Sequence, residues 1–388
     1  MRQTSHKLRI GIVGPSWPFR GGIAKFTTEL AKNLSKEGYL KCFLSVSKQY
    51  PQFLFPGKSD KDENSCRKVD LAKPIYSYYE PWTWRRVIRE IDKSDLDCVI
   101  APYWSSTSAP FLNYLARKSS RPVIPIIHNF LDHDSVIKSS KLSEWALKRA
   151  TAFVHHNPEF SNLEFFRRRS NKVLFKAHPV TSVRNSSLRL SRMKLKIPEG
   201  LTCFLFFGLI RPYKGLDVLL DAMELLPSDA PVAFLIAGEP WTKRKHYERR
   251  LRKLSDKFFI HSKLEWIPEQ ETACWFSAAD AIVCPYLKAT GSGVVSQALA
   301  FQKPVLTTYT GSMSYVIHEG KTGLLSEPGS AKALARNIKL FLSPKVRKKL
   351  ESGIKEASGF TWKSYVDSLV DLAERSIGSN NREGSLLN

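Results

Sequence analysis

Residues 201–220, LTCFLFFGLIRPYKGLDVLL, indicate the fold of this chain and raise the first question about its function. The run up to Phe207 is apolar, which is typical of a strand buried on both faces, and an amphipathic helical pattern begins at Leu216. Arg211 and Lys214 lie in the turn between them. Cations near the start of a helix oppose its dipole, whereas a negatively charged ligand there is favourable. We therefore expect an anion to bind at this turn, with two solvated cations as the alternative.

The alternation of apolar runs and helical patterns extends from this stretch in both directions. In the first half it begins with LRIGIV at 8–13 and a helical pattern at 21–38, and in the second half it continues to about residue 343. Continuous apolar strands separated by helices are typical of parallel sheets covered on both faces. The sequence therefore predicts an α/β protein with two doubly wound, Rossmann-like domains facing across a cleft, with ligands at the carboxyl ends of the strands.

The domain boundaries follow from the point where this pattern restarts. The linker is expected near 180–198, at the end of a basic segment, 165–196, that contains ten Lys or Arg residues and no Asp or Glu. We predict an N-terminal domain at 1–190, a second domain at 191–358, a C-terminal helix at 359–378 that packs back on the N-terminal domain, and a disordered tail at 379–388.

The charge balance and the cysteines restrict the class of protein. The 388 residues include 60 Lys and Arg against 36 Asp and Glu, a formal net charge of +24, which favours nucleic acid, an anionic membrane face or phosphorylated ligands as partners. No apolar stretch approaches the roughly 20 residues of a membrane span and the N-terminus lacks a secretory signal, so we expect a cytoplasmic protein. The cysteines form no C-x-x-C pair and are expected to be buried hydrophobes: Cys42, Cys66, Cys98, Cys203, Cys274 and Cys284.

Two further loops that follow predicted strands carry candidate ligand-binding groups. Gly21 and Gly22 open a helix, where free N–H groups and the dipole favour an anion, although a plain turn explains them equally well. Their surroundings do not match G-x-G-x-x-G, so a nicotinamide cofactor is not expected. Residues 290–293, Thr-Gly-Ser-Gly, form a donor-rich loop that leads into another helix, with Gln297 one turn into it.

Histidines stand at the ends of two predicted strands. His128 follows the apolar run PVIPII at 122–127, and His155 and His156 close the next strand. A lone histidine is usually structural, but the position of His128 at a strand end makes contact with a ligand an equal alternative. The other two rank lower.

Taken in order, these motifs resemble those of retaining glycosyltransferases of the GT-B fold, family-4 type, the glycosyl transferases of group 1. The stretches PFRGGIAKF, GLIRPYKGLDVLLDA and WIPEQETACWFSAADAIVCPY are similar to the family's glycine loop, basic loop and lead-in to the donor site. GSGVVSQALAFQKPVLTT and GKTGLLSEPGS are similar to its last two signatures. The resemblance covers nearly the whole chain and implies an N-terminal acceptor domain followed by a nucleotide-sugar donor domain.

The resemblance also implies roles for individual residues. Arg211 and Lys214 would neutralise the donor diphosphate, and His128 would contact the donor sugar near the reacting carbon. Tyr103 and Trp104, after a strand of the first domain, would contact the acceptor, with core packing as the alternative. The remaining donor contacts that it implies are Gly21, Gly22, Ile267, Thr290, Gly291, Ser292, Gly293, Val294 and Gln297.

The implied reaction moves a sugar from a nucleotide-diphosphate sugar to a hydroxyl of a saccharide or lipid-linked acceptor, with retention of anomeric configuration, in cell-surface polysaccharide or glycolipid biosynthesis. Because the leaving group is a dianion, Arg211, Lys214 and helix N-termini would supply the main electrostatic stabilisation. We expect no cofactor, no metal and no nucleic-acid partner. The excess charge and the aromatic and basic residues of WTWRRVIREI (82–91) predict peripheral binding to the anionic cytoplasmic face of a membrane.

Departures from the family's pattern leave alternatives open. The family's signature has glutamates where this chain has Ala289 and Gln297, and its arginine directly follows the glycine, where this chain has Leu209. A catalytically inactive carbohydrate- or nucleotide-binding protein is therefore one alternative, and a GT-B sugar-nucleotide epimerase is another. Charge alone favours a nucleic-acid binder, for which the sequence has no recognised module signature.

Overall fold

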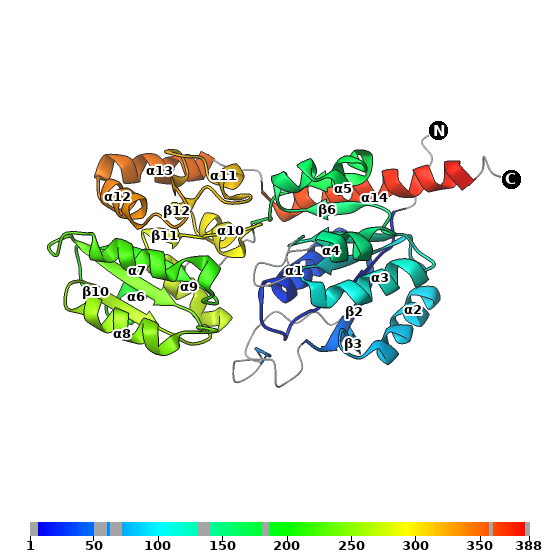
Figure 1. Cartoon of the computed structure of the whole chain (residues 1–388), viewed down its shortest axis with the longest axis horizontal. Helices are drawn as coiled ribbons and strands as arrows, with labels where there is room; N and C mark the ends of the chain where they lie inside the picture. The colour runs from blue at the N-terminus through cyan, green and yellow to red at the C-terminus, as the bar shows by residue number, and fades with distance from the viewer. Residues whose placement is uncertain are drawn as a thin grey trace. The chain divides into compact units, whose positions relative to one another are not determined.

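The computed structural model describes residues 7–49, 60–62, 72–130, 140–180, 186–356 and 360–384. The chain divides into two compact units, each with helices packed around a sheet (Figure 1). Unit 1 comprises Met1–Ala177 and Trp362–Asn388, and unit 2 comprises His178–Thr361. Cys66, residues 181–185 of the expected linker and residues 385–388 of the expected tail lie outside the described residues.

Unit 1 contains a seven-stranded parallel sheet with the strand order β3-β2-β1-β4-β5-β6-β7. Its strands are β1 (Ile10–Val13), β2 (Leu40–Lys48), β3 (Ala72–Ser77), β4 (Cys98–Tyr103), β5 (Val123–Ile127), β6 (Phe153–His155) and β7 (Val173–Phe175). The order reverses between β1 and β4, which makes this the doubly wound arrangement that the sequence predicts.

Helices cover both faces of this sheet because its strands are apolar on both sides. Along β4, Val99, Ala101 and Tyr103 pack with α2 to α5, whereas Cys98 and Ile100 pack with α1 and α14. Successive side chains of a strand point to opposite faces, so one apolar run serves two cores. The helices are α1 (Gly22–Lys36), α2 (Trp84–Lys93), α3 (Ala109–Lys118), α4 (Ser140–Leu147), α5 (Glu164–Arg167) and α14 (Trp362–Gly384).

The C-terminal helix α14 belongs to unit 1 and packs against α1. Tyr365, Val366 and Leu369 are at most 1% exposed and share a cluster with Phe26 of α1. The helix continues to Gly384, so the expectation of a disordered tail from residue 379 is corrected for residues 379–384. Once a helix is anchored by packing, each further residue adds a hydrogen bond without a new nucleation cost, which explains this extension through polar sequence.

Unit 2 contains a six-stranded parallel sheet with the order β10-β9-β8-β11-β12-β13. Its strands are β8 (Thr202–Phe207), β9 (Val232–Ala237), β10 (Phe259–Lys263), β11 (Ala281–Cys284), β12 (Val305–Thr308) and β13 (Gly323–Ser326). Its helices are α6 (Leu188–Lys194), α7 (Leu216–Glu224), α8 (Arg244–Ser255), α9 (Glu269–Ala278), α10 (Gly293–Ala300), α11 (Met313–Val316), α12 (Ala331–Phe341) and α13 (Pro344–Glu356). The predicted pair of doubly wound units is therefore confirmed.

The region expected to be a linker contains an ordered helix, α6. Arg192 donates to the carboxylate of Asp280 at 2.7 Å, and Leu195 and Ile197 are each 7% exposed. A helix of two turns gives too little periodicity to be recognised from sequence. The basic segment 165–196 is consequently divided between the two units. Among the described helices, none is both long enough and apolar enough to cross a bilayer.

The packing of α14 leads to a stability prediction. Leu369→Ala removes a fully buried side chain and should lower the free energy of unfolding of unit 1 by about 2–5 kcal/mol, measured by chemical denaturation. Lys363→Ala on the exposed side of the same helix breaks one surface ion pair with Asp367 and should change it by less than about 1 kcal/mol. Equal effects of the two substitutions would show that α14 is not part of the core.

Candidate functional site

Unit 2 brings two chemically distinctive loops together at the carboxyl ends of neighbouring strands. β8 and β11 pair in the sheet, and the loops that follow them span residues 208–215 and 285–292. The backbone N–H of Leu287 donates to the carbonyl of Tyr213 at 2.7 Å and ties the loops to each other. Ligands of doubly wound folds bind at this edge of the sheet.

Two glycines allow the loops to approach closely. Gly215 has a φ of +73°, and a Cβ at this position would lie 2.0 Å from the carbonyl oxygen of Pro285. Gly208 has a φ of +96°, and a Cβ there would lie 3.4 Å from Lys214 Nζ and 3.5 Å from Val294 Cγ2. Gly208 therefore marks the place where the Lys214 amine meets the first turn of α10.

Lys214 is a partly buried cation that pairs with no carboxylate among the described residues. Burial, with a smaller contribution from the charge of Arg211, lowers the pKa of its amine from 10.5 to about 8. Its Nζ lies 5.8 Å from the centre of the Tyr286 ring. A bound anion would favour the charged amine and raise this pKa again.

Arg211 is held by an aromatic ring that the sequence analysis did not identify. Its guanidinium carbon lies 3.7 Å from the centre of the Trp241 ring, a cation–π contact. Trp241 follows β9, the neighbour of β8, and the backbone N–H of Ile210 donates to the carbonyl of Glu239 at 2.9 Å. The available signal was an aromatic residue soon after the apolar run VAFLIAG.

The N-terminus of α10 faces open space next to Lys214. Ser292 caps this helix, because its Oγ accepts from the N–H of Val295 at 3.2 Å and lies 3.0 Å from the hydroxyl of Tyr286. Gly293 is exposed, and a Cβ there would meet no atom within 4 Å. The first amides of a helix lack intrahelical acceptors and attract anions, so this end complements the two cations.

The other expected donor contacts of unit 2 differ in exposure. Gly291 and Gln297 are partly exposed, Gln297 one turn into α10. Thr290 is 8% exposed and Ile267 is 6% exposed. Ala289, where the family has a glutamate, is 9% exposed. The structure thus groups Arg211, Lys214 and the start of α10, while contacts through Thr290, Gly291, Ile267 and Gln297 stay predictions.

In unit 1 the expected glycine loop is open, whereas His128 is packed. Gly21 and Gly22 are exposed at the start of α1, and a Cβ on Gly22 would meet no atom within 4 Å. His128 is 5% exposed, with its ring 4.8 Å from that of Phe26 and 4.9 Å from that of His156. Contact between His128 and a donor sugar stays a prediction.

The neighbouring histidines, His155 and His156, are buried. His155 is fully buried, which lowers the pKa of its imidazole to about 4. His156 is 1% exposed, and its Nδ1 lies 2.8 Å from the carbonyl oxygen of Lys176.

The expectation that Tyr103 contacts an acceptor is corrected. Tyr103 is 1% exposed within the core of unit 1, and its hydroxyl lies 2.8 Å from the Oγ of Ser143. This side chain points into the core because it shares the face of β4 that α3 and α4 cover. Trp104 is partly exposed and stands edge-on to Tyr78, with 5.0 Å between the ring centres. Of Tyr103 and Trp104, only Trp104 therefore has a side-chain surface that is accessible to an acceptor.

The partly buried amine of Lys214 leads to a prediction about stability and pH. The folded state lowers the pKa of this amine below its unfolded value. The charged amine therefore destabilises the folded state by its full amount below pH 8, and this destabilisation disappears as the pH rises toward 10.5. Lys214→Met should therefore stabilise the unliganded protein by about 1–3 kcal/mol at pH 7. The gain should shrink by pH 10 in denaturant unfolding. A gain that does not depend on pH would contradict a desolvated charge at this position.

Comparison with known proteins identifies the fold and the domain. Residues 189–358 match the family of glycosyl transferases group 1. The D-inositol 3-phosphate glycosyltransferase of Mycobacterium tuberculosis is 28% identical over 202 residues, and the match covers 50% of this chain and 42% of that protein. The chain thus matches less than half the length of this curated relative.

Two solved structures extend the similarity to nearly the whole chain. A glycosyltransferase from Rickettsia africae has a TM-score of 0.72 at 16% identity, covering 96% of this chain and 99% of that one. HepE from Anabaena, in complex with UDP-glucose, has a TM-score of 0.71 at 12% identity, covering 96% and 99%. The chain therefore has the GT-B fold of these glycosyltransferases, and residues 189–358 of its second unit match the family of glycosyl transferases group 1.

Proposed function

We propose that this protein is a glycosyltransferase that moves a sugar from a nucleotide-diphosphate sugar to a hydroxyl acceptor with retention of configuration. The observation that carries the proposal is the partly buried Lys214 amine, placed with Arg211 at the carboxyl end of β8 and next to the start of α10. This group of positive charge suits a diphosphate better than a neutral ligand. The similarity to HepE, whose solved structure contains UDP-glucose, supports the same ligand class.

In the proposed reaction, the bond between the anomeric carbon of the sugar and the diphosphate oxygen breaks, and the acceptor oxygen bonds to that carbon. The nucleotide diphosphate leaves with the bonding electron pair. Arg211, Lys214 and the first amides of α10 stabilise the negative charge that develops on the leaving oxygen. A phosphate oxygen of the leaving group takes the acceptor proton. The proposal also gives Gly21 and Gly22 a role in binding the donor phosphates and His128 a role in contacting the donor sugar.

The proposed acceptor is a saccharide or a lipid-linked saccharide of cell-surface polysaccharide or glycolipid biosynthesis. The net charge of +24 supports a place of action at an anionic surface, which we take to be the cytoplasmic face of a membrane. A binding protein without activity is the second candidate. It is favoured by Ala289 and Gln297, which stand in place of the family's glutamates.

The first test is release of nucleotide diphosphate from a panel of sugar nucleotides. The wild-type protein should release it slowly even without an acceptor, because water can replace the acceptor hydroxyl. NMR of a transferred product should show the anomeric configuration of the donor. Binding of sugar nucleotides with no release under any condition would favour the binding protein.

Lys214→Ala should weaken the binding of nucleotide diphosphate by about 1.5–3 kcal/mol in calorimetry, the range for a hydrogen bond to a charged group. Lys245→Ala is the matched control, since Lys245 is an exposed lysine on α8 of the same unit. If the two variants bind alike, Lys214 does not contact the diphosphate.

The pKa of Lys214 gives the same step a pH dependence. The free amine titrates near pH 8 and a bound diphosphate raises its pKa, so binding takes up a proton above pH 8. The affinity for nucleotide diphosphate should not change with pH through this amine below pH 8, and it should fall as the pH rises above 8. Calorimetry in buffers of different ionisation enthalpy measures the uptake. Lys214→Met should abolish it, and uptake that persists in this variant would assign it to another group.

Gln297 is predicted to lie near the donor ribose. Gln297→Glu restores the family's usual residue and should alter nucleotide preference, whereas Gln297→Ala should weaken donor binding. If neither variant differs from wild type in turnover or preference, Gln297 has a structural role.

A further inference from the structure

Helices α2, α3 and α4 form one layer over the sheet of unit 1, and the outer side of this layer is strongly basic. The exposed cations on these helices and on the turn after α4 are Arg85, Arg86, Arg89, Lys93, Arg117, Lys118, Lys141, Lys148 and Arg149. The same elements carry three carboxylates: Glu90, Asp92 and Glu144. Glu90 is paired with Lys73 at 3.5 Å, and Asp92 accepts from the hydroxyl of Ser120 at 2.6 Å. We call this surface the α2–α4 face.

Helix α14, on the opposite layer of unit 1, does not share this excess. The exposed charged residues of α14 up to residue 378 are Lys363, Arg375, Asp367, Asp371 and Glu374. Acidic side chains thus outnumber basic ones on α14. The charge of unit 1 is therefore distributed unevenly between the α2–α4 face and α14.

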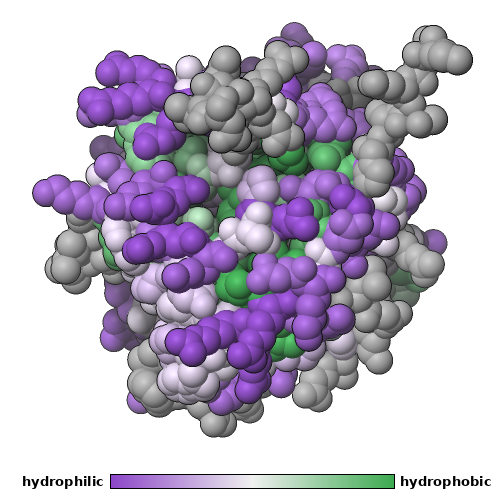
Figure 2. Space-filling model, turned by 90° about the vertical axis from the view of Figure 1, so that its right-hand side faces the viewer, coloured by the Kyte–Doolittle hydropathy of each residue, from purple (hydrophilic) through white to green (hydrophobic). Residues whose placement is uncertain are grey.

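Large apolar side chains stand among the cations of the α2–α4 face. Trp82 is 71% exposed in the short 3-10 helix Pro81–Thr83, directly before α2. On α4, Trp145 and Leu142 are 39% and 40% exposed. The carbonyl of Trp145 accepts from Asn113, which neighbours Tyr114 on α3. On the face shown in Figure 2, hydrophobic areas likewise lie between strongly hydrophilic side chains.

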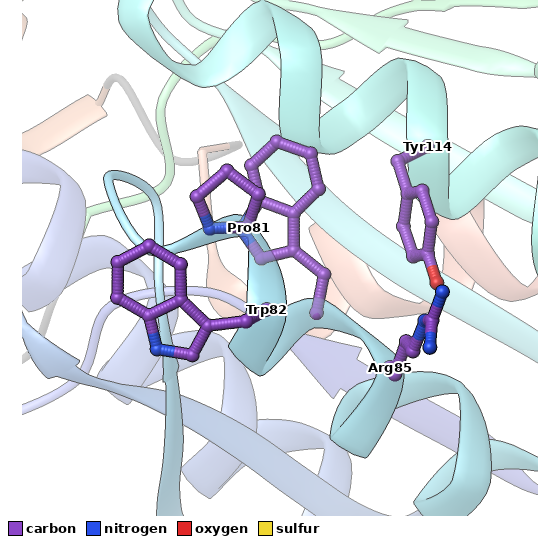
Figure 3. Close-up of a pocket in the computed structure, with 5 residues that line it drawn as sticks. Pro81, Trp82, Arg85 and Tyr114 are labelled. Carbon is purple, nitrogen blue, oxygen red and sulfur yellow. The ribbon is translucent and has the colours of Figure 1, made fainter.

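A pocket of about 510 Å³ opens where Trp82 meets α2 and α3, and it is lined by Pro81, Trp82, Trp84, Arg85 and Tyr114 (Figure 3). The Trp84 indole is anchored, since its N–H donates to the carbonyl of Ser77 at 2.8 Å. Arg85 reaches from α2 toward Tyr114, while the Trp82 ring points away from both. The pocket therefore combines aromatic walls with a phosphate-binding guanidinium.

Cations and exposed tryptophans together distinguish between possible partners. An acidic protein or polysaccharide would account for the cations but gives no reason for a tryptophan that is 71% exposed. At a bilayer surface, tryptophan lies at the level of the headgroups and cations are attracted to anionic lipids. A bilayer surface therefore accounts for both kinds of side chain.

We propose that the α2–α4 face is the surface by which this protein docks on an anionic lipid bilayer, with Trp82 inserted among the headgroups and Arg85 on a lipid phosphate. The proposal rests on the proposed function in one respect, the action on an acceptor at a membrane. It adds the residues that make the contact and the orientation of unit 1 on the surface.

Co-sedimentation with vesicles tests the proposal. Vesicles of phosphatidylcholine with phosphatidylglycerol should bind the wild-type protein, those of phosphatidylcholine alone should bind it much more weakly, and added salt should weaken the binding. The variant Arg85→Ser, Arg86→Ser, Arg89→Ser should bind anionic vesicles at least about tenfold more weakly. The matched control Lys245→Ser, Arg249→Ser, Arg252→Ser removes three exposed cations from α8 of unit 2 and should bind like wild type. If both variants lose vesicle binding equally, the binding depends on the net charge of the protein and the proposal is wrong.

Tryptophan fluorescence tests the insertion of Trp82 separately. Anionic vesicles containing brominated phosphatidylcholine should quench part of the wild-type emission. Trp82→Phe should still fold, with an unchanged circular dichroism spectrum, but should lose most of that quenching. Quenching that is the same in wild type and variant would show that Trp82 does not enter the interface.

These assays need no sugar nucleotide, so their failure is separate from failure of the proposed reaction. Release of nucleotide diphosphate from a soluble donor should be equal in wild type and in the α2 variant. If the protein binds vesicles but releases no nucleotide diphosphate, the proposed reaction is wrong and the proposed docking surface still holds. Heparin binding that depends on the α2 cations, without binding to vesicles, would overturn the bilayer in favour of an acidic polysaccharide.

Discussion

The desolvated amine of Lys214 is the constraint on which the candidate site depends. A lysine whose pKa has fallen to about 8 is costly to keep charged, and no carboxylate among the described residues offsets that cost. The loop around it uses two glycines with positive φ to bring the amine close to α10. This strain and desolvation have a physical rationale if an anion completes the site, because the same low-polarity surroundings that penalise the lone cation strengthen its attraction to a diphosphate.

The sheet of unit 2 can hold such a site because large apolar side chains pack its strands. β8 and β9 contribute Phe204, Phe206 and Phe234, each at most 1% exposed, to a cluster that also includes helix residues from α7 and α12. A rigid sheet fixes the ends of its strands. The loops that leave β8 and β11 therefore start from fixed positions, and the hydrogen bond between Leu287 and Tyr213 needs to order only a few residues. Positioning of the cations is in this sense a consequence of the packing below them.

Sequence patterns predicted the strands and the cation loop because both are local features. LTCFLFF is apolar at every position except Thr202, so a buried strand follows directly, and the cations stand in the turn after it. A similar uniformity in the strand that contains Tyr103 prevents a prediction of where this side chain points. In CVIAPY both faces are apolar, so alternation gives no sign of which residues point into which core, and Tyr103 was assigned to a ligand although it packs inside. Trp241 was missed because its contact with Arg211 depends on the pairing of β8 with β9, which is a property of the sheet and not of either segment.

The start of α1 illustrates how a loop of unit 1 depends on the far end of the chain. Phe26, one turn into α1, has its ring 4.8 Å from that of His128, 5.3 Å from that of Trp362 and 5.7 Å from that of Tyr365. The exposed glycines 21 and 22 have no side chains with which to fix the direction of the helix, and this cluster of rings is part of the packing that does so. Because two of the rings come from α14, the C-terminal helix contributes to the packing that holds the N-terminal part of α1 in place. The last helix of the chain thus packs beside the loop that the sequence predicts to bind a ligand, and the surroundings of that loop cannot be understood from residues 14–26 alone.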